Sequence, residues 1–468
     1  INTYSGKIKR KLPKAPINNA HFLTDKQGQL TAATGIDEKE NKLVYLFNQD
    51  SKTWNKVDSD MVGQNFQPLA VSDSGNYLYA LDNYNQDKTG LFKLSLNDSG
   101  YESVYTDKEV DITGIAITEN GRHAYAIRID PDYPNYLLFN KKNKEAKVFK
   151  NLLGAFPGYQ VNITSQTSDG NKSIVFASSD RDPGTYYLFD KDKNSLKSLF
   201  NMLDKLNVNE LAETLPIAFK TSDGVDIHGY LTKPIGKENS KNPTVVKVHG
   251  GPFGIRDYWL FDYETQVLAQ AGYNVLTINF RGSGGYGVAF QQSGYKQWGG
   301  RIQQDIIEAA SWAIKLGHTN KNKICIMGSS FGAYSAVQSA ILAPNLFQCA
   351  IANAGIYDLV LLHEEDMIND LYTGKHFLSR TFGDDLTQLN NFSPSKHADK
   401  LLSPILIAHG KQDEIAPFEH AIALKDALDK HNKPYEWFIK DSASHGFHDE
   451  KSRLEYMQTV LTFLNKHL

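Results

Sequence analysis

The first 200 residues repeat a short pattern about every 47 residues, and this periodicity constrains the fold more than any other feature. In each unit a turn glycine follows one strand-like run and precedes a second, and the unit closes with a short run such as TWNKV or EAKVF. The turn glycines are Gly28, Gly75, Gly121 and Gly170, separated by 47, 46 and 49 residues. About four short strands per 40–50 residues is typical of a β-propeller blade. We therefore predict an all-β propeller over residues 1–206, with an accidentally regular β-sandwich as the alternative.

Only four such units are visible, with a fragment of another over residues 4–12. Four blades can close a ring, but larger rings are commoner, so we expect these units to be the C-terminal part of a larger propeller. The chain starts at Ile1 rather than at Met, which agrees with an N-terminal truncation. A removed signal peptide and a lost part of a domain both stay open.

From about residue 207 the rhythm changes to apolar strand runs that alternate with helical runs. Continuous Val, Ile and Leu strands separated by helices indicate a mostly parallel, doubly wound sheet covered on both faces. Residues 207–468 are therefore predicted to form an α/β domain. The expected strands are 244–248, 273–279, 323–327, 349–353, 404–409 and 435–439, and the expected helices are 260–271, 303–316, 332–343, 418–430 and 451–467.

Composition excludes several classes of partner. The chain of 468 residues is 41% hydrophobic and 22% charged with a formal net charge of −3, so we expect a soluble, globular protein of two or three domains. Without a basic excess or an apolar run of membrane-spanning length, we expect neither a nucleic-acid partner nor a membrane span. The two cysteines, Cys325 and Cys349, lie in apolar runs and are expected to be buried thiols. The compartment (cytoplasmic or periplasmic) and a homo-oligomeric state stay open.

The segment Gly328-Ser329-Ser330-Phe331-Gly332 has the G-x-S-x-G spacing of a nucleophile elbow. This pattern alone is frequent by chance, but here it lies between a predicted strand and a predicted helix. A serine exposed at a tight strand-to-helix turn can attack a carbonyl, and the flanking glycines allow the turn. The spacing makes Ser330 the candidate nucleophile and Ser329 the spacer.

A serine hydroxyl needs a base, and the base needs an orienting acid, in the chain order Ser, Asp or Glu, His of α/β-hydrolases. Asp413 follows the strand run PILIAHG, and His445 lies in a polar loop after the strand run YEWFIK. Glu414 and His448 are the neighbouring rivals. We predict the triad Ser330, Asp413 and His445, because each partner follows its own strand and His445 opens a glycine turn.

The reaction also needs N–H donors for an oxyanion. One is the amide of Phe331, directly after the nucleophile. The other comes from the run VHGGPFG, where Gly250 and Gly251 allow close backbone approach, and we favour Gly251. The hydroxyl of Tyr258 is a weaker candidate donor.

The other motifs give weaker indications of function than the elbow and its partners. The run NFRGSGGYG fits G-x-G-x-x-G but lacks the following helix and the acidic residue of a dinucleotide site, so a loop bordering the cleft is expected. Arg281 in this run binds a substrate carbonyl or carboxylate, or pairs with Asp305; both stay open. Ile356 and Tyr357 are weak candidates for pocket walls. No spacing typical of a zinc site is present, and we expect no metal and no cofactor.

Together these motifs resemble the prolyl oligopeptidase family of serine peptidases, in its acylaminoacyl-peptidase and dipeptidyl aminopeptidase-like branch. The resemblance runs through almost the whole C-terminal half, including VHGGPFG, NFRGSGGYG, ICIMGSSFGAY and SPSKHADKLLSPILIAHGKQDEIAP. Members join an N-terminal β-propeller to a C-terminal α/β-hydrolase domain. The resemblance implies Ser330 as nucleophile, Asp413 as acid and His445 as base, with an oxyanion hole from the amides of Gly251 and Phe331.

Two departures from the family pattern stand out. The family elbow usually reads G-G-S-Y-G-G, whereas Ser329, Phe331 and Ala333 replace Gly, Tyr and Gly here. Ile415 occupies the position, two residues after the acid, where the family often has an arginine. The second departure puts an ion pair of the family in doubt.

The leading functional hypothesis is a serine peptidase that cleaves short peptides through an acyl-enzyme, with the propeller capping the cleft. The first alternative is a carboxylesterase that uses the same triad. The second is a non-catalytic binding protein with a hydrolase-like domain. The preference for the side chain before the scissile bond, and the exo- or endopeptidase mode, stay open at this point.

Overall fold

The computed structural model describes residues 4–8, 12–98, 100–118, 123–139, 143–238, 240–364 and 367–468. Gly121 of the repeat lies outside these ranges. Backbone contacts divide the chain into two compact units, Ile1–Ile129 with Tyr136–Ala146, and Asp130–Asn135 with Lys147–Leu468. The boundary between residues 206 and 207 remains a prediction.

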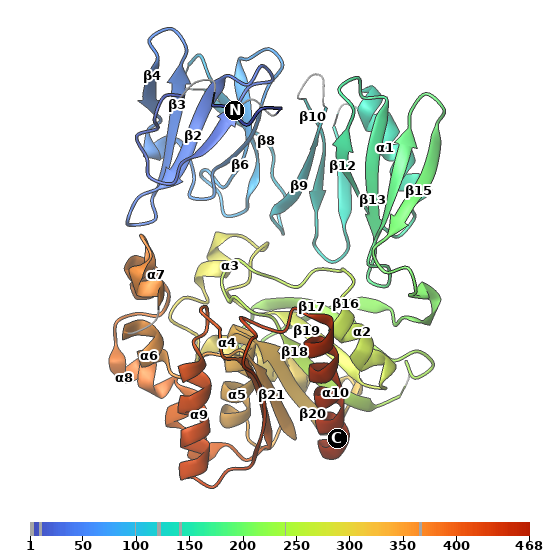
Figure 1. Ribbon diagram of the computed structural model, residues 1–468, viewed down its shortest axis with the longest axis vertical. Helices are drawn as coiled ribbons and strands as arrows, with labels where there is room; N and C mark the ends of the chain where they lie inside the picture. The colour runs from blue at the N-terminus through green and yellow to red at the C-terminus, as the bar shows by residue number, and fades with distance from the viewer. Residues whose placement is uncertain are drawn as a thin grey trace. The chain divides into compact units, whose positions relative to one another are not determined.

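The N-terminal strands form small antiparallel sheets (Figure 1). Two sheets have four strands in sequential order and a third has three, in the order β11-β10-β9. Their strands are β1 (His21–Thr24), β2 (Leu30–Ile36), β3 (Lys42–Asn48), β4 (Thr53–Lys56), β5 (Gln67–Val71), β6 (Tyr77–Asp82), β7 (Gly90–Ser95), β8 (Tyr101–Tyr105), β9 (Ile112–Ile117), β10 (Ala124–Ile129) and β11 (Asn135–Leu138). Alternate side chains of the first two sheets, among them Ala32, Val44, Leu78 and Leu94, bury a shared apolar core.

The predicted turn glycines adopt the conformation that their role requires. Gly28, Gly75 and Gly170 have φ values of 75°, 71° and 70°, where residues with a Cβ atom are strained. Gly170 belongs to a fourth sheet in the second unit, of order β12-β13-β14-β15. Its strands are β12 (Gln160–Gln166), β13 (Lys172–Ser178), β14 (Thr185–Asp190) and β15 (Ser195–Asn201).

The closing strand expected at EAKVF is wrong, because this run begins helix α1 (Lys144–Ala155). The Asn143 side chain caps the helix, accepting hydrogen bonds from the amides of Glu145 and Ala146 at 2.8 and 3.2 Å. Ala146, Phe149 and Leu152 are buried at a helical spacing. Because these apolar residues recur every three positions, the segment forms a helix instead of the strand that the sequence repeat predicted.

The C-terminal sheet has eight strands in the order β16-β17-β19-β18-β20-β21-β22-β23. It is parallel from β19 to β23, whereas β16 and β17 pair antiparallel at one edge. The strands are β16 (Thr214–Lys220), β17 (Asp226–Thr232), β18 (Asn242–Val248), β19 (Asn274–Asn279), β20 (Thr319–Ser329), β21 (Cys349–Asn353), β22 (Ile405–Gly410) and β23 (Tyr435–Lys440). All six predicted α/β strands are confirmed.

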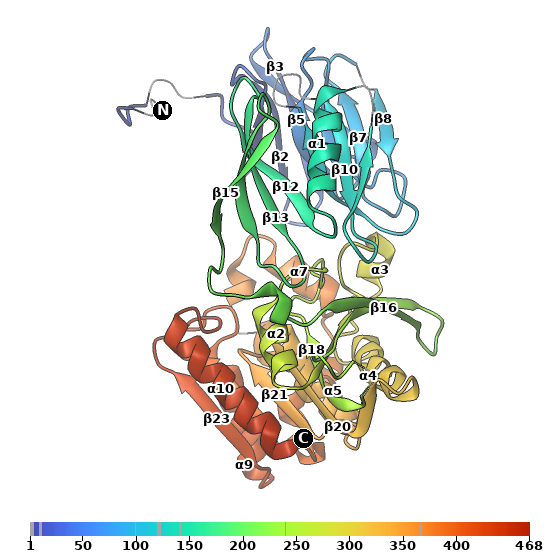
Figure 2. The same cartoon turned by 90° about the vertical axis from the view of Figure 1, so that its right-hand side faces the viewer.

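Helices cover both faces of this sheet (Figures 1 and 2). Helices α4, α5 and α9 pack on one apolar cluster, and α2 and α10 pack on the other. The helices are α2 (Tyr263–Gln270), α3 (Val288–Gln292), α4 (Arg301–Lys315), α5 (Phe331–Leu342), α6 (Leu359–Glu364), α7 (Gly374–Thr381), α8 (Leu386–Asn391), α9 (Phe418–Lys430) and α10 (Glu450–His467). The five predicted helices are confirmed, and the mixed α/β architecture follows from burial of the parallel strands on both faces.

Cys325 and Cys349 are both fully buried but are not free thiols. They lie opposite each other in the register of β20 and β21 and form a disulfide, with their Cα atoms 4.7 Å apart. The prediction that both cysteines are buried is correct. The prediction that they are free thiols is wrong, because the sequence could not show that their two strands are neighbours in the sheet.

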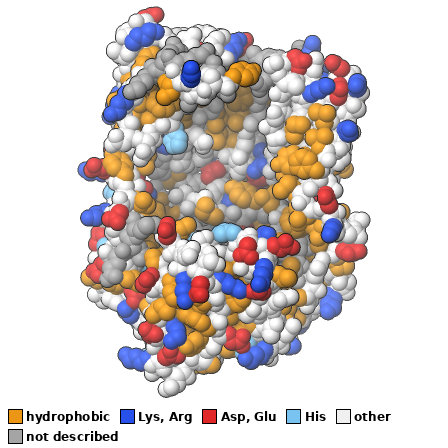
Figure 3. Space-filling view, viewed as in Figure 1, with side chains coloured by type: hydrophobic (Ala, Val, Ile, Leu, Met, Phe, Trp, Pro, Cys, Tyr) orange, Lys and Arg blue, Asp and Glu red, His pale blue; other side chains and the backbone are white. Residues whose placement is uncertain are grey.

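The surface agrees with the near-neutral charge. Figure 3 shows acidic and basic side chains interspersed over the face that it presents. Within the described ranges, no helix has the length and apolar character needed to cross a membrane.

Candidate active site

Ser330 lies at the turn between β20 and α5, in a conformation that residues with a side chain rarely adopt. Its φ is 59° and its ψ is −122°, and its amide donates to the carbonyl of Asn353 at 2.9 Å. Such strain is typical of functional turns, where the surroundings hold the residue in place. The strand–turn–helix frame predicted for the elbow is confirmed.

The two elbow glycines are required by close backbone approach. A Cβ atom on Gly328 would lie 2.4 Å from the backbone of Gly332, and one on Gly332 would lie 2.1 Å from the carbonyl oxygen of Val248. Any other residue would push α5 away from the sheet. The exchange of the usual glycine for Ser329 causes no such clash, because its side chain is exposed and accepts a hydrogen bond from Asn353 at 3.1 Å.

The glycine loop after β18 lies beside the nucleophile. A Cβ atom on Gly250 would be 3.6 Å from the Cβ atom of Ser330. Gly251 follows with a φ of 121°, which only glycine adopts readily. The amide of Phe331 opens α5, where the first N–H groups of a helix lack partners inside the helix. Phe331 thus directly follows Ser330, and Gly251 follows the glycine that lies beside it, while the oxyanion role of their amides remains a prediction.

His249 anchors this glycine loop, a role that sequence reasoning missed. Its Nδ1–H donates to the carbonyl of Gly250 at 2.7 Å, and its Nε2 accepts from the Ser283 hydroxyl at 3.0 Å. The ring stacks on Phe280 with centroids 4.2 Å apart. The signal that could have found it was the histidine directly before the two glycines of VHGGPFG.

Asp413 and His445 are hydrogen-bonded, as the predicted order of acid and base requires. The Nδ1–H of His445 donates to Asp413 Oδ2 at 2.8 Å, while Asp413 Oδ1 accepts from the amides of Ile415 and Ala416, each at 2.9 Å. The Asp413 carboxylate is fully buried, and the His445 side chain is 24% exposed. The imidazole can therefore face both the carboxylate and a substrate.

The surroundings of Asp413 keep it ionised. Burial raises its pKa, but hydrogen bonds from His409, His445 and the Ala416 amide outweigh burial and hold the pKa well below its ordinary value. Within the described part of the chain, the Ser330 hydroxyl makes no hydrogen bond to His445. In enzymes without substrate such contacts are often long and tighten on binding.

Arg281 is a structural residue in this fold, so the substrate-binding interpretation is not supported. The residue is 6% exposed, and its guanidinium donates to Asp305 at 2.8 Å and to Asp223 at 2.9 and 3.0 Å. Pairing with Asp305, the alternative expected from the sequence, is confirmed, and Asp223 adds a second partner. Four of the five N–H donors are thereby used.

Replacing Arg281 by methionine is expected to lower the free energy of unfolding by about 3 kcal/mol, because Asp305 would remain buried without its partner. Replacing Lys220, whose ion pair with Asp226 is exposed, should cost less than about 1 kcal/mol. Urea denaturation of both variants measures this difference. Equal losses would contradict the structural role of Arg281.

The weak pocket candidates Ile356 and Tyr357 belong to the hydrophobic core. Ile356 is 8% exposed and Tyr357 is fully buried, within the cluster that α5 and α9 cover. Such burial does not support a pocket-wall role for either residue. The sequence run after AIANAG packs into the core instead of facing solvent.

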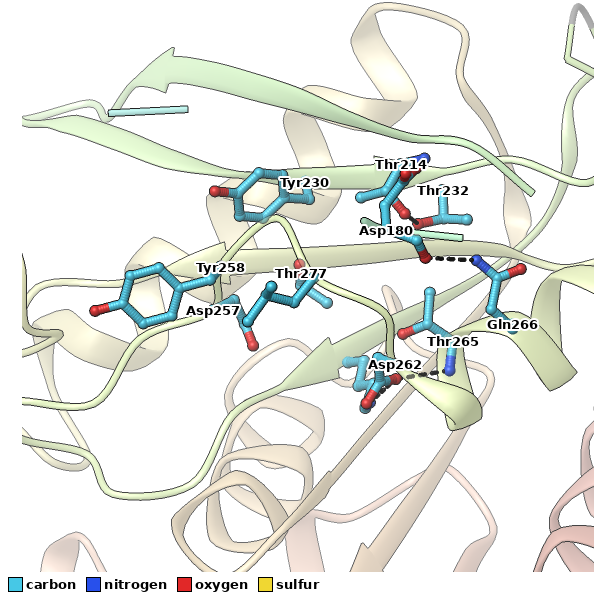
Figure 4. A pocket seen from close by; sticks show the side chains of 12 residues that line it. Asp180, Thr214, Tyr230, Thr232, Asp257, Tyr258, Asp262, Thr265, Gln266 and Thr277 are labelled. Carbon is cyan, nitrogen blue, oxygen red and sulfur yellow. Dashed lines mark hydrogen bonds and ion pairs between the residues drawn. The ribbon is translucent and has the colours of Figure 1, made fainter. Parts of the chain in front are cut away.

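Tyr258 is exposed by 37% and lines a pocket next to the β18–α2 loop. The guanidinium of Arg256 lies over its ring, 4.7 Å from the centroid. Figure 4 shows Tyr258 at one end of this pocket and the hydrogen bond from Gln266 to the carbonyl of Asp180 at the other. No triad residue lines this pocket, so Tyr258 as an oxyanion donor remains a prediction.

No metal site emerges from the described ranges. Among these residues, no group of three or more His, Cys, Asp or Glu side chains is placed to hold a metal ion. The expectation of no metal and no cofactor stays a prediction.

Comparisons with known proteins agree with this geometry. Residues 259–468 match the family model described as the prolyl oligopeptidase family. Dipeptidyl aminopeptidase BIII of Pseudoxanthomonas mexicana is 28% identical over 398 residues, which are 81% of this chain and 56% of that protein. The chain thus spans about half the length of the curated relatives it matches.

Solved structures share the fold. A puromycin-hydrolyzing peptidase of Mycobacterium tuberculosis superposes with a TM-score of 0.78 at 20% identity, over 98% of this chain and 71% of that chain. Pyrococcus horikoshii acylaminoacyl peptidase superposes with a TM-score of 0.69 at 19% identity, over 93% of this chain and 69% of that chain.

Proposed function

We propose that the chain is a serine peptidase of the prolyl oligopeptidase family, whose model residues 259–468 match, and that it acts on short peptides. The observation that carries the proposal is the buried Asp413 carboxylate hydrogen-bonded to His445, in a chain that also holds Ser330 at a strained elbow. The relatives support the same class, because their names describe dipeptidyl and acylaminoacyl peptidases.

In the proposed reaction, the Ser330 hydroxyl attacks the carbonyl carbon of the scissile bond while His445 Nε2 takes its proton. The carbonyl oxygen becomes an oxyanion, which the amides of Gly251 and Phe331 stabilise. Each such donor is worth about 3–4 kcal/mol in known cases. The C–N bond then breaks, and His445 gives its proton to the leaving amine. Water, activated by His445, hydrolyses the acyl-enzyme and regenerates Ser330.

Asp413 has an orienting role in this scheme. Its Oδ2 accepts the Nδ1–H of His445, which fixes the tautomer whose Nε2 can take a proton, and it stabilises the imidazolium that forms. Since its pKa lies well below its ordinary value, Asp413 stays ionised throughout the neutral range.

The proposed substrate class, short peptides, is inferred from the N-terminal sheets. We propose that residues 1–206 contribute blades of a β-propeller and residues 207–468 the α/β-hydrolase domain. The antiparallel, sequentially ordered sheets and the repeated turn glycines support this division. In the family that the sequence resembles, a propeller accompanies peptidases far more often than esterases, and this favours a peptidase over a general esterase.

A panel of peptide anilides with matched ester substrates tests the proposal. We expect turnover of anilides as well as esters by the wild-type chain, with both activities lost in Ser330→Ala. Comparing free and blocked N-termini then separates aminopeptidase from acylaminoacyl-peptidase action. Turnover of the esters alone would contradict a peptidase and identify the chain as a carboxylesterase. Turnover of neither substrate would indicate a binding protein.

A further inference from the structure

A second histidine lies against the proposed catalytic acid, and the mechanism above does not use it. His409 is near the end of β22, and Asp413 lies in the turn that follows this strand. The side chain of His409 is fully buried, and its ring packs against Phe418 with centroids 5.8 Å apart. Burying a polar ring costs free energy unless its nitrogens are hydrogen-bonded. A buried imidazole beside the acid therefore indicates a function for its hydrogen bonds.

The contacts of His409 indicate which of its ring nitrogens donates a hydrogen bond. Its Nε2 lies 2.8 Å from the carbonyl oxygen of Ala416 and 3.4 Å from Asp413 Oδ2. Both neighbours are acceptors, so Nε2 carries the hydrogen. Nδ1 has no hydrogen-bond partner among the described residues. A buried N–H without an acceptor would cost about 1–3 kcal/mol, so these contacts favour the tautomer that carries its hydrogen on Nε2.

This N–H closes a chain of hydrogen bonds that holds the acid in place. His409 donates to the carbonyl of Ala416, and the amide of Ala416 donates to Asp413 Oδ1. With Oδ1 held, Asp413 directs Oδ2 at His445. Because His409 belongs to a strand with neighbours on both sides in the sheet, the turn after β22 is anchored to a rigid element.

We propose that His409 is a positioning residue of the active site, whose Nε2–H anchors the 413–416 turn so that Asp413 presents Oδ2 to His445. This inference rests on the proposed peptidase function. His409 touches no substrate, and it acts through the orientation of Asp413. Supporting groups of this kind typically change activity by about 10–100-fold when lost.

The test compares two substitutions of His409, by glutamine and by asparagine, whose amide side chains differ in length. In His409→Gln the amide nitrogen can occupy the place of Nε2, whereas in His409→Asn the side chain is one methylene shorter and falls short of Ala416. With a peptide anilide, we expect His409→Asn to lower kcat at least about tenfold with KM changed less than about twofold. We expect His409→Gln to keep kcat within about threefold of the wild type.

His420 provides the matched control. It is also fully buried, and its Nδ1 lies 3.4 Å from the amide nitrogens of Tyr357 and Asp358, which follow β21. His420→Asn should lower the melting temperature but leave kcat of the folded protein within about threefold. Melting curves of all three variants give the folded fraction to which each kcat is normalised.

Equal kcat values for His409→Gln and His409→Asn would overturn the inference, as would the same loss of kcat in His420→Asn. If His409→Asn fails to fold, a His409→Gln variant with kcat about tenfold below the wild type also overturns it. A wild-type chain that cleaves no anilide and no ester would instead refute the proposed function. The two failures are thus distinguishable.

Discussion

Replacing Ser330 by alanine is expected to lower kcat on a peptide anilide by about 10⁶-fold while leaving the fold intact. The large effect follows because the substitution removes the nucleophile and leaves only binding and the oxyanion donors. Alanine keeps the Cβ atom, so the strain at a φ of 59° is the same as for serine. Steady-state kinetics and a thermal melt of the variant measure the two parts of this prediction.

Ser329 supplies the control for Ser330, one residue away in the same turn. Its side chain is exposed and bonds only Asn353 among the described residues. We expect Ser329→Ala to keep kcat within about threefold, in line with loss of one exposed hydrogen bond. A severe loss in Ser329→Ala with activity retained in Ser330→Ala would reverse the assignment of spacer and nucleophile.

The second large effect is expected at Asp413. Asparagine in its place is expected to lower kcat by about 10⁴-fold, as the equivalent change does in a known serine protease. The amide nitrogen of asparagine is a donor, so it favours the His445 tautomer whose Nε2 carries the proton and cannot act as a base. Kinetics should show the loss in kcat, with KM little changed because Asp413 contacts no substrate.

Glu414→Gln is the matched control, since Glu414 is exposed and adjacent to Asp413 in the chain. It should leave kcat within about twofold, as expected for a surface substitution. Loss of activity in Glu414→Gln with an active Asp413→Asn would identify the neighbouring carboxylate as the acid.

Asp413 also contributes to the acid stability of the protein. Its pKa is lower in the folded than in the unfolded chain, so its contribution is present above the unfolded value of about 3.9 and is lost as the pH falls toward the folded value. Asp413→Asn should therefore flatten the decrease of stability below about pH 4, which urea denaturation between about pH 3 and pH 6 would show.

Much of the α/β fold could be predicted from the sequence because its strands are buried on both faces. Continuous apolar runs identified all six parallel strands, and the spacing at the elbow identified the turn that holds Ser330. Those signals are local, and tertiary packing reinforces them. The order of Asp413 and His445 could be predicted because each follows a strand whose C-terminal end meets the same edge of the sheet.

The remaining features depend on contacts that no local pattern encodes. The disulfide needed β20 and β21 to be neighbours, and the burial of Tyr357 needed the segment after β21 to pack into the core. Arg281 found a second partner in Asp223, which lies 58 positions away in the sequence. The role of His409 could not be predicted, because the sequence shows only a histidine at the end of an apolar run. A hydrogen-bonded histidine of the core would fit the same position.

Labelling with a fluorophosphonate probe tests the central claim, that Ser330 is an activated nucleophile, most directly. The wild-type chain should gain one probe adduct, which peptide mapping places on Ser330. Ser329→Ala should label at a similar rate, Asp413→Asn more slowly, and Ser330→Ala not at all. An unlabelled wild type, or equal labelling of Ser330→Ala, would contradict the account.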